Sequence, residues 1–136
     1  MNQNLKGTQR HGESVSLLEL RSPQWHACCA EPVVTVDAMA EASKEDLDRA
    51  LRAHRNGTWI NDAAVATENI QALCGGGGLV TSRHRTSRNT EIWVASWFEP
   101  AVGVARPRTM VATTDELNDL SRWRLTPTGE AACEAV

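Results

Sequence analysis

Tyrosine is absent from this 136-residue sequence and phenylalanine occurs once, so five tryptophans supply nearly all of the aromatic content. No apolar run approaches the roughly 18–20 residues that a membrane-spanning helix needs, which excludes such a helix. The first six residues, Met-Asn-Gln-Asn-Leu-Lys, do not contain the apolar core of a secretory signal. We therefore expect a cytoplasmic protein.

The sequence patterns of common enzymes are also missing. Neither Gly-x-Ser-x-Gly nor His-Glu-x-x-His occurs, and no Lys-Ser or Lys-Thr follows the four glycines at 75–78. That glycine run is interpreted as a joint between a helix and a strand. Acidic residues gather at helix starts, where the helix dipole explains them, and His54 lies on the apolar face of its helix. We predict binding rather than catalysis, with no catalytic residues and no cofactor.

The cysteines have spacings that do not favour a metal site. Cys28 and Cys29 are adjacent, which suits two ligands of one tetrahedral metal poorly, and Cys74 and Cys133 form no Cys-x-x-Cys motif with them. In a reducing compartment, free thiols are the default. We predict four free, buried cysteines and no bound metal.

Composition and charge are those of one globular domain. Hydrophobic residues make up 41% and charged residues 23%, and we expect a flexible N-terminus over 1–13 followed by a single domain over 14–136. The net charge is −3, but residues 83–108 contain five arginines and only two glutamates, which gives +3. Arginine suits phosphate groups and guanine edges. A solvated surface hairpin explains the same arginines equally well.

Three helices are predicted in the middle of the chain. Ser43 followed by acidic residues predicts a helix start, and a helix over 43–55 then places Leu47, Ala50, Leu51 and His54 on one apolar stripe. Gly57 follows as a residue suited to positive φ. A short helix over 63–66 comes next, and a third helix over 70–74 opens at Thr67.

Strands are predicted on both sides of these helices. The β-branched segment 32–36 predicts one strand, and residues 79–98 predict a β-hairpin whose turn contains the arginine-rich segment 83–89. Residues 101–112 are interpreted as a connector. Thr113 and Glu116 fit a capping box, and the chain is expected to end with a strand over 123–126 and a helix from 127 to 136.

Two segments resemble winged-helix bacterial and phage transcriptional regulators. Ile70-Gln71-Ala72-Leu73 followed by Gly78-Leu79-Val80 is similar to a recognition helix running into a wing, and Trp123-Arg124-Leu125-Thr126-Pro127-Thr128-Gly129 is similar to the step that closes such domains. The resemblance implies an α+β winged-helix-like fold that binds duplex DNA through a helix-turn-helix and an arginine-rich wing. It assigns base contacts to Thr67, Asn69 and Gln71, and phosphate contacts to Arg83, Arg85 and Arg88.

A protein-binding function is the alternative. Small acidic proteins of phages or mobile elements often inhibit host protein complexes, as anti-CRISPR proteins do, and this chain has the size and charge for that role. Tryptophan is favoured at protein interfaces, and the chain has five: Trp25, Trp59, Trp93, Trp97 and Trp123. We expect most of them in the core, and a homodimer interface is a further use for the others.

Overall fold

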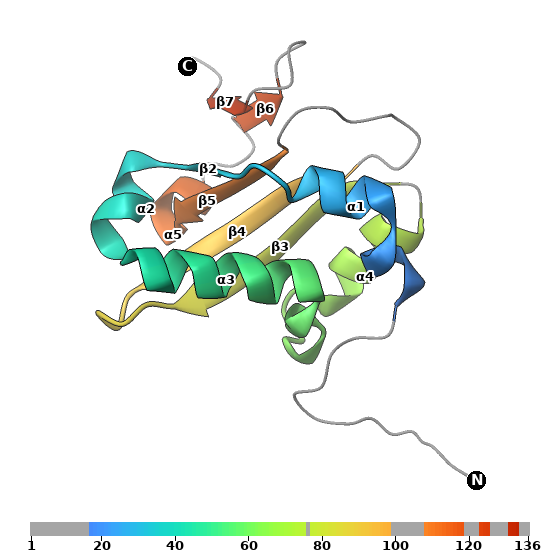
Figure 1. Cartoon of the computed structure of the whole chain (residues 1–136), viewed down its shortest axis with the longest axis horizontal. Coiled ribbons are helices and arrows are strands. Elements are labelled where there is room, and N and C mark those ends of the chain that lie inside the picture. Colours follow the sequence, from blue (N-terminus) through green and yellow to red (C-terminus); the bar gives the residue numbers. More distant parts are fainter. Residues whose placement is uncertain (1–16, 76, 99–107, 119–122, 126–130, 134–136) are drawn as a thin grey trace, which may run out of the picture.

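The computed structural model describes residues 17–75, 77–98, 108–118, 123–125 and 131–133, and it has the mixed α+β character expected from the sequence. Its helices are η1 (Leu18–Arg21), α1 (Pro23–Cys28), α2 (Val36–Glu41), α3 (Lys44–Asn56), η2 (Thr58–Asn61), α4 (Ala66–Cys74) and α5 (Thr114–Asn118). Its strands are β2 (Val33–Val34), β3 (Gly78–Arg85), β4 (Glu91–Phe98), β5 (Thr109–Thr113), β6 (Trp123–Leu125) and β7 (Ala131–Cys133). Figure 1 shows α1 and α3 in front of the sheet that contains β3, β4 and β5.

Four strands form the main sheet in the order β2-β5-β4-β3. β3 and β4 pair antiparallel from Gly78 opposite Phe98 to Arg85 opposite Glu91, which confirms the predicted hairpin. β4 also pairs antiparallel with β5, whereas β5 pairs parallel with β2. β6 and β7 form a separate two-stranded sheet.

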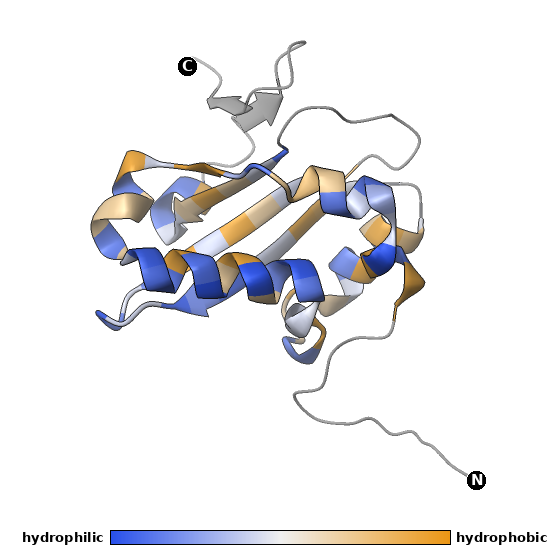
Figure 2. Cartoon of the chain, in the orientation of Figure 1, coloured by the Kyte–Doolittle hydropathy of each residue, from blue (hydrophilic) through white to orange (hydrophobic). Residues whose placement is uncertain are grey.

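The alternation of side chains along β4 decides which residues enter the core. Every second side chain is buried on the face that α1 and α3 cover, namely Ile92, Val94, Ser96 and Phe98. Trp25 of α1 packs edge-on against Phe98, with 5.6 Å between ring centroids, and its indole N–H donates to the Arg55 carbonyl of α3 at 3.0 Å. Figure 2 shows the matching colours, with hydrophilic residues along the outer side of α3 and hydrophobic residues along β4.

The start of α3 also holds the turn of the hairpin. Ser43 and Asp46 form the capping box of α3. The buried Asp46 carboxylate in addition accepts hydrogen bonds from the backbone N–H and the hydroxyl of Ser87 in the β3–β4 turn. The hydrogen bond from the Ser43 backbone N–H, followed by those from Ser87, holds the pKa of Asp46 well below its usual range. At its other end α3 stops as predicted, because Gly57 has a φ of 79°.

The N-terminal half contains two short helices, one of which replaces part of a predicted strand. Ser22-Pro23 begins a helix: the Ser22 hydroxyl accepts the Trp25 N–H and Pro23 fills the first turn of α1. The predicted strand over 32–36 is only two residues long, since Thr35 caps α2, which begins at Val36. Local side-chain caps override the β-branched pattern here.

The helix before the glycine run is continuous. The predicted short helix over 63–66 is wrong, because residues 63–65 form a turn and α4 begins at Ala66. Thr67 and Asn69 consequently lie inside α4 rather than before it. The glycine joint is confirmed, since α4 ends at Cys74 and β3 begins at Gly78. Gly78 has a φ of 141°, and an added Cβ would lie 3.3 Å from that of Ala72, so the joint requires glycine there.

The C-terminal part differs from the predicted secondary structure at two segments. The segment interpreted as a connector, 101–112, contributes β5 from Thr109 onward, while 101–107 lies outside the described residues. The predicted final helix is wrong at 131–133, which form β7, and its other residues are not described. The Thr113–Glu116 capping box is confirmed by a bond from the Thr113 N–H to the Glu116 carboxylate at 2.9 Å and one from the Glu116 N–H to the Thr113 hydroxyl at 3.3 Å.

In the part of the chain that the structure describes, no helix is long and apolar enough to cross a membrane. The segment 1–13, expected as a flexible terminus, lies outside that part.

Candidate functional site

Arg83, a predicted phosphate contact, forms an intramolecular ion pair with a carboxylate. Its Nε and Nη2 donate to the two oxygens of Asp62 at 2.8 and 3.1 Å, a bidentate geometry. These hydrogen bonds lower the pKa of Asp62 and raise the pKa of Arg83. The Arg83 side chain remains half exposed, so one edge of the guanidinium is still open to solvent.

The two other hairpin arginines, Arg85 and Arg88, differ from each other. Arg88 Nη1 donates to the Ala40 carbonyl at 2.6 Å, which directs it toward the end of α2. Arg85 Nη1 makes a 3.3 Å bond to the Asn89 carbonyl within its own turn, and its side chain is exposed. The hydrogen bond of Arg85 therefore stays within its own turn, whereas those of Arg83 and Arg88 reach other segments.

The excess of arginine between 83 and 108 does not become one cationic patch. Asp62 neutralises Arg83, the Asp46 carboxylate lies against the turn, and Arg106 is outside the described residues. Both aspartates come from segments far from the hairpin in sequence. A charge count along the chain cannot include them.

The predicted base contacts on α4 divide into two kinds. Thr67 and Gln71 are exposed. Asn69 is buried, and its side-chain amide pairs with the backbone of β3: Nδ2 donates to the Thr81 carbonyl at 2.7 Å, and Oδ1 accepts the Thr81 N–H at 3.0 Å. Asn69 fastens α4 to the sheet, and its polar atoms are not available to a base edge.

These contacts fasten α4 and the turn before it to β3. The Asn69–Thr81 pair joins the middle of α4 to β3, and the Asp62–Arg83 pair joins the turn before α4 to the same strand. Thr81, Arg83 and Arg85 alternate along β3 and so share one face of it. We call the set Thr67, Gln71, Arg83 and Arg85 the α4–β3 surface.

His54 has the core position that the sequence predicts. Its ring lies among buried residues, with Nδ1 2.7 Å from the Ser82 hydroxyl and Nε2 2.8 Å from the Ser96 hydroxyl. The Ser82 hydroxyl also hydrogen-bonds to His84 Nε2 at 2.7 Å, and the Ser96 hydroxyl to the Thr109 hydroxyl at 2.6 Å. We call this set, His84-Ser82-His54-Ser96-Thr109, the buried polar chain.

Burial keeps both imidazoles of the chain neutral. Desolvation, with a smaller effect from His84, lowers the pKa of His54 to about 3. Desolvation, with a smaller effect from Arg49, lowers the pKa of His84 to about 4. Since both ring nitrogens of His54 are already hydrogen-bonded, this geometry is that of a satisfied core histidine.

The serines of the polar chain were missed in the sequence, although a signal was present. Ser96 occupies the same alternating positions of β4 as Ile92, Val94 and Phe98, and Ser82 follows Val80 in the same way. A hydroxyl at an inward position needs a partner. Identifying His54 as the partner of these hydroxyls requires the register of the sheet, which the sequence does not supply.

No disulfide bond joins the three cysteines whose side chains are described: Cys28 is buried, Cys29 half-buried and Cys74 exposed. The exposure of Cys74 corrects the prediction that all cysteines are buried. Burial, assisted by the neighbouring Cys28, raises the pKa of Cys29 to about 12. Among the described residues, no three His, Cys, Asp or Glu side chains come together as a metal site would need.

Two of the four tryptophans whose side chains are described belong to the core. Trp25 and Trp59 are buried, whereas Trp93 and Trp97 are half-buried. Like the indole of Trp25, two further indoles donate to internal acceptors, Trp59 to the His54 carbonyl (3.2 Å) and Trp93 to the Thr114 hydroxyl (3.2 Å). The side chain of Trp123 is not among those described.

Comparison of the chain with protein-family models, with curated proteins and with solved structures found no match.

Proposed function

We propose that this protein binds duplex DNA as a winged-helix-like protein, and that the α4–β3 surface makes the contact. The observation that carries the proposal is the attachment of α4 to the hairpin. Asn69–Thr81 and Asp62–Arg83 fix α4 and the turn before it to β3, the strand that carries Arg83 and Arg85. A polar helix face suits base edges and arginine suits phosphates.

The element order supports the proposal. Helix α3, helix α4 and the β3–β4 hairpin follow one another as the two helices and wing of a winged helix do. The hairpin tip is docked on α2 and α3 through Arg88 and Ser87. In this proposal the strand face, through Arg83 and Arg85, therefore takes the role that a protruding wing tip has elsewhere.

The experiment is a titration of labelled duplex DNA by fluorescence anisotropy at several salt concentrations. We expect the Arg85→Ala variant to lose one phosphate contact, which reduces the log–log salt slope by about 0.9 in magnitude. Asp62→Asn is expected to increase the magnitude of the salt slope, because it removes the carboxylate that pairs with Arg83. The asparagine keeps a side-chain oxygen that can accept the Ala64 N–H, as the Asp62 carboxylate does. Thr67→Ala and Gln71→Ala are expected to change which sequence is preferred.

The matched control is Lys44→Ala, which removes one positive charge from the start of α3, on the other face of the sheet, at a side chain that is 85% exposed. It should leave the salt slope unchanged. No duplex binding at micromolar protein in low salt, where even non-specific association is detectable, would contradict the proposal. Equal losses in Arg85→Ala and Lys44→Ala would show that only net charge matters.

A second candidate function is binding of a partner protein, as an inhibitor of a host complex would require. The observation that favours it is an apolar patch on β2 and α2, where Val33, Val36 and Met39 are 44%, 76% and 55% exposed. The double variant Val36→Asp/Met39→Asp should abolish co-purification of a specific partner from host cells, whereas Arg85→Ala should not. Sedimentation of the purified protein separates this outcome from self-association.

A further inference from the structure

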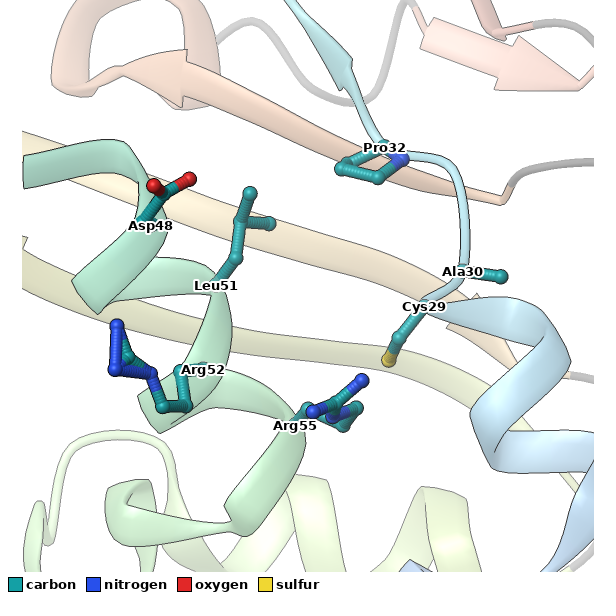
Figure 3. Close-up of a pocket in the computed structure, with 7 residues that line it drawn as sticks. All are labelled: Cys29, Ala30, Pro32, Asp48, Leu51, Arg52 and Arg55. Atoms are coloured by element: carbon teal, nitrogen blue, oxygen red, sulfur yellow. The ribbon is translucent and has the colours of Figure 1, made fainter. Parts of the chain in front are cut away.

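A cavity of about 350 Å³ opens between α3 and the segment that joins α1 to β2. Its walls come from both segments (Figure 3) and consist of Cys29, Ala30, Pro32, Asp48, Leu51, Arg52 and Arg55. The volume is at the lower end of the range for small-molecule sites. No part of the α4–β3 surface lines this cavity.

Two arginines of this cavity are unpaired within the described part of the chain. Arg52 and Arg55 are three residues apart on α3, so they lie on neighbouring turns of one helix face. In the part of the chain that the structure describes, neither guanidinium group has a hydrogen bond or an ion pair. The one acidic side chain of the lining, Asp48, is already paired with the Lys44 ammonium at 3.0 Å.

The rest of the lining is neutral. Leu51, Ala30 and Pro32 present apolar surface. Figure 3 shows the Cys29 thiol pointing from the opposite wall toward Arg55. Burial raises the pKa of this thiol to about 12, so it is uncharged at neutral pH and does not repel an anion.

We propose that this cavity binds a small phosphate monoester, with Arg52 and Arg55 on the phosphate and the apolar part of the ligand against Leu51 and Pro32. Two unpaired guanidinium groups balance the two negative charges of a phosphate monoester, and their planar donors suit its oxygens. A monocarboxylate would leave one positive charge uncompensated.

This site is independent of the proposed DNA contact. The cavity lies on the side of the sheet that α3 covers, and part of its wall leads into β2, at one edge of the sheet. Arg83 and Arg85 belong to β3, at the opposite edge. Binding of a phosphate monoester is therefore testable in the absence of DNA.

The test is isothermal titration calorimetry of the full chain with phenyl phosphate, inorganic phosphate and benzoate. We expect phenyl phosphate to bind more tightly than inorganic phosphate, because its ring reaches the apolar wall, and benzoate to bind more weakly than either. Arg52→Gln and Arg55→Gln should each weaken phenyl phosphate binding at least about tenfold, as expected for loss of a charge-assisted hydrogen bond.

Two controls complete the design. Arg21→Gln removes the same charge at an exposed residue outside the cavity and should bind phenyl phosphate as the parent protein does, whereas Ala30→Phe keeps both arginines and should block the cavity. Thermal melting of each variant verifies that it is folded. The proposal is overturned by absence of binding at about 10 mM phenyl phosphate, by equal losses in Arg52→Gln and Arg21→Gln, or by benzoate binding as tightly as phenyl phosphate.

Discussion

His54 shows how a polar side chain can occupy the core of a small domain. Both ring nitrogens face serine hydroxyls, at 2.7 and 2.8 Å, so no polar atom of the imidazole is left unpaired. Protonation would require both nitrogens to donate and would place a charge in an apolar surrounding. The buried polar chain is therefore stable only while His54 is neutral.

This arrangement predicts a loss of stability in mild acid. The unfolded chain takes up a proton on each imidazole near pH 6.5, whereas the folded chain keeps the pKa of His54 at about 3 and that of His84 at about 4. The contribution of the two neutral histidines to the free energy of unfolding should be complete above about pH 6.5. The free energy of unfolding should then fall toward pH 4, by up to about 1.4 kcal/mol per pH unit for each histidine. Urea unfolding at about pH 7.5, 6 and 5 measures this slope.

The variant His84→Gln supplies the control for this prediction. It removes one of the two titrating imidazoles and keeps a side chain that can hydrogen-bond to Ser82. The pH dependence between about 6.5 and 4 should fall to roughly half. A free energy of unfolding that is the same at pH 7.5 and pH 5 would contradict the assignment of both low pKa values.

At the scale of elements, one carboxylate connects a helix start to a distant turn. Asp46 closes the capping box of α3 and accepts two groups of Ser87, which is 41 residues away in the chain. Arg88 and Thr90 add bonds from the same turn to the carbonyls of Ala40 and Glu41. The β3–β4 turn is therefore fixed to the α2–α3 corner.

We predict that Asp46→Asn loosens the hairpin turn as well as the helix start. The amide group carries no charge and can accept through only one oxygen, so the Ser87 N–H loses its strongest acceptor. Hydrogen exchange should then be faster at the Ser87 amide, and the urea midpoint should decrease. The neighbouring Glu45→Gln is the matched control, because Glu45 is exposed in the same helical turn. An unchanged Ser87 exchange rate in Asp46→Asn would refute the clamp.

At the scale of the whole molecule, β5 connects the two halves of the sheet. It lies between β4 and β2, and four of its five residues are buried. Val111 lies opposite Val94 and joins the core beneath α2 and α3. The sheet therefore depends on a segment whose sequence neighbourhood indicates only a connector.

Truncation of Val111 tests this position. Val111→Ala removes two buried methyl groups from a fully enclosed site, and we expect the free energy of unfolding to fall by about 2–3 kcal/mol. Val36→Ala makes the same chemical change at a residue that is 76% exposed, and its effect should stay within about 0.5 kcal/mol. Similar small effects of both substitutions would mean that β5 is not a core strand. Thermal and urea unfolding provide the values.

Local chemistry in the sequence determined α3, the glycine joint and the β3–β4 hairpin. Ser43 and Gly57 set the two ends of α3 because a side-chain oxygen and a residue tolerant of positive φ act within one turn of chain. The alternation of β4 and the turn before it likewise lie within twenty residues. The core position of His54 follows from the helical period alone.

Only the tertiary structure decided how those elements are used. β5 became a central strand because β4 and β2 both pair with it, and Asn69 left the candidate DNA contact because its amide meets the backbone of Thr81. Asp62 and Asp46 reached the hairpin from other segments, so five nearby arginines did not form one cationic patch. Arg52 and Arg55, which the sequence did not single out, line a cavity whose opposite wall comes from the 29–32 segment. Each of these outcomes depends on contacts between residues distant in sequence, and no local propensity or charge count contains them.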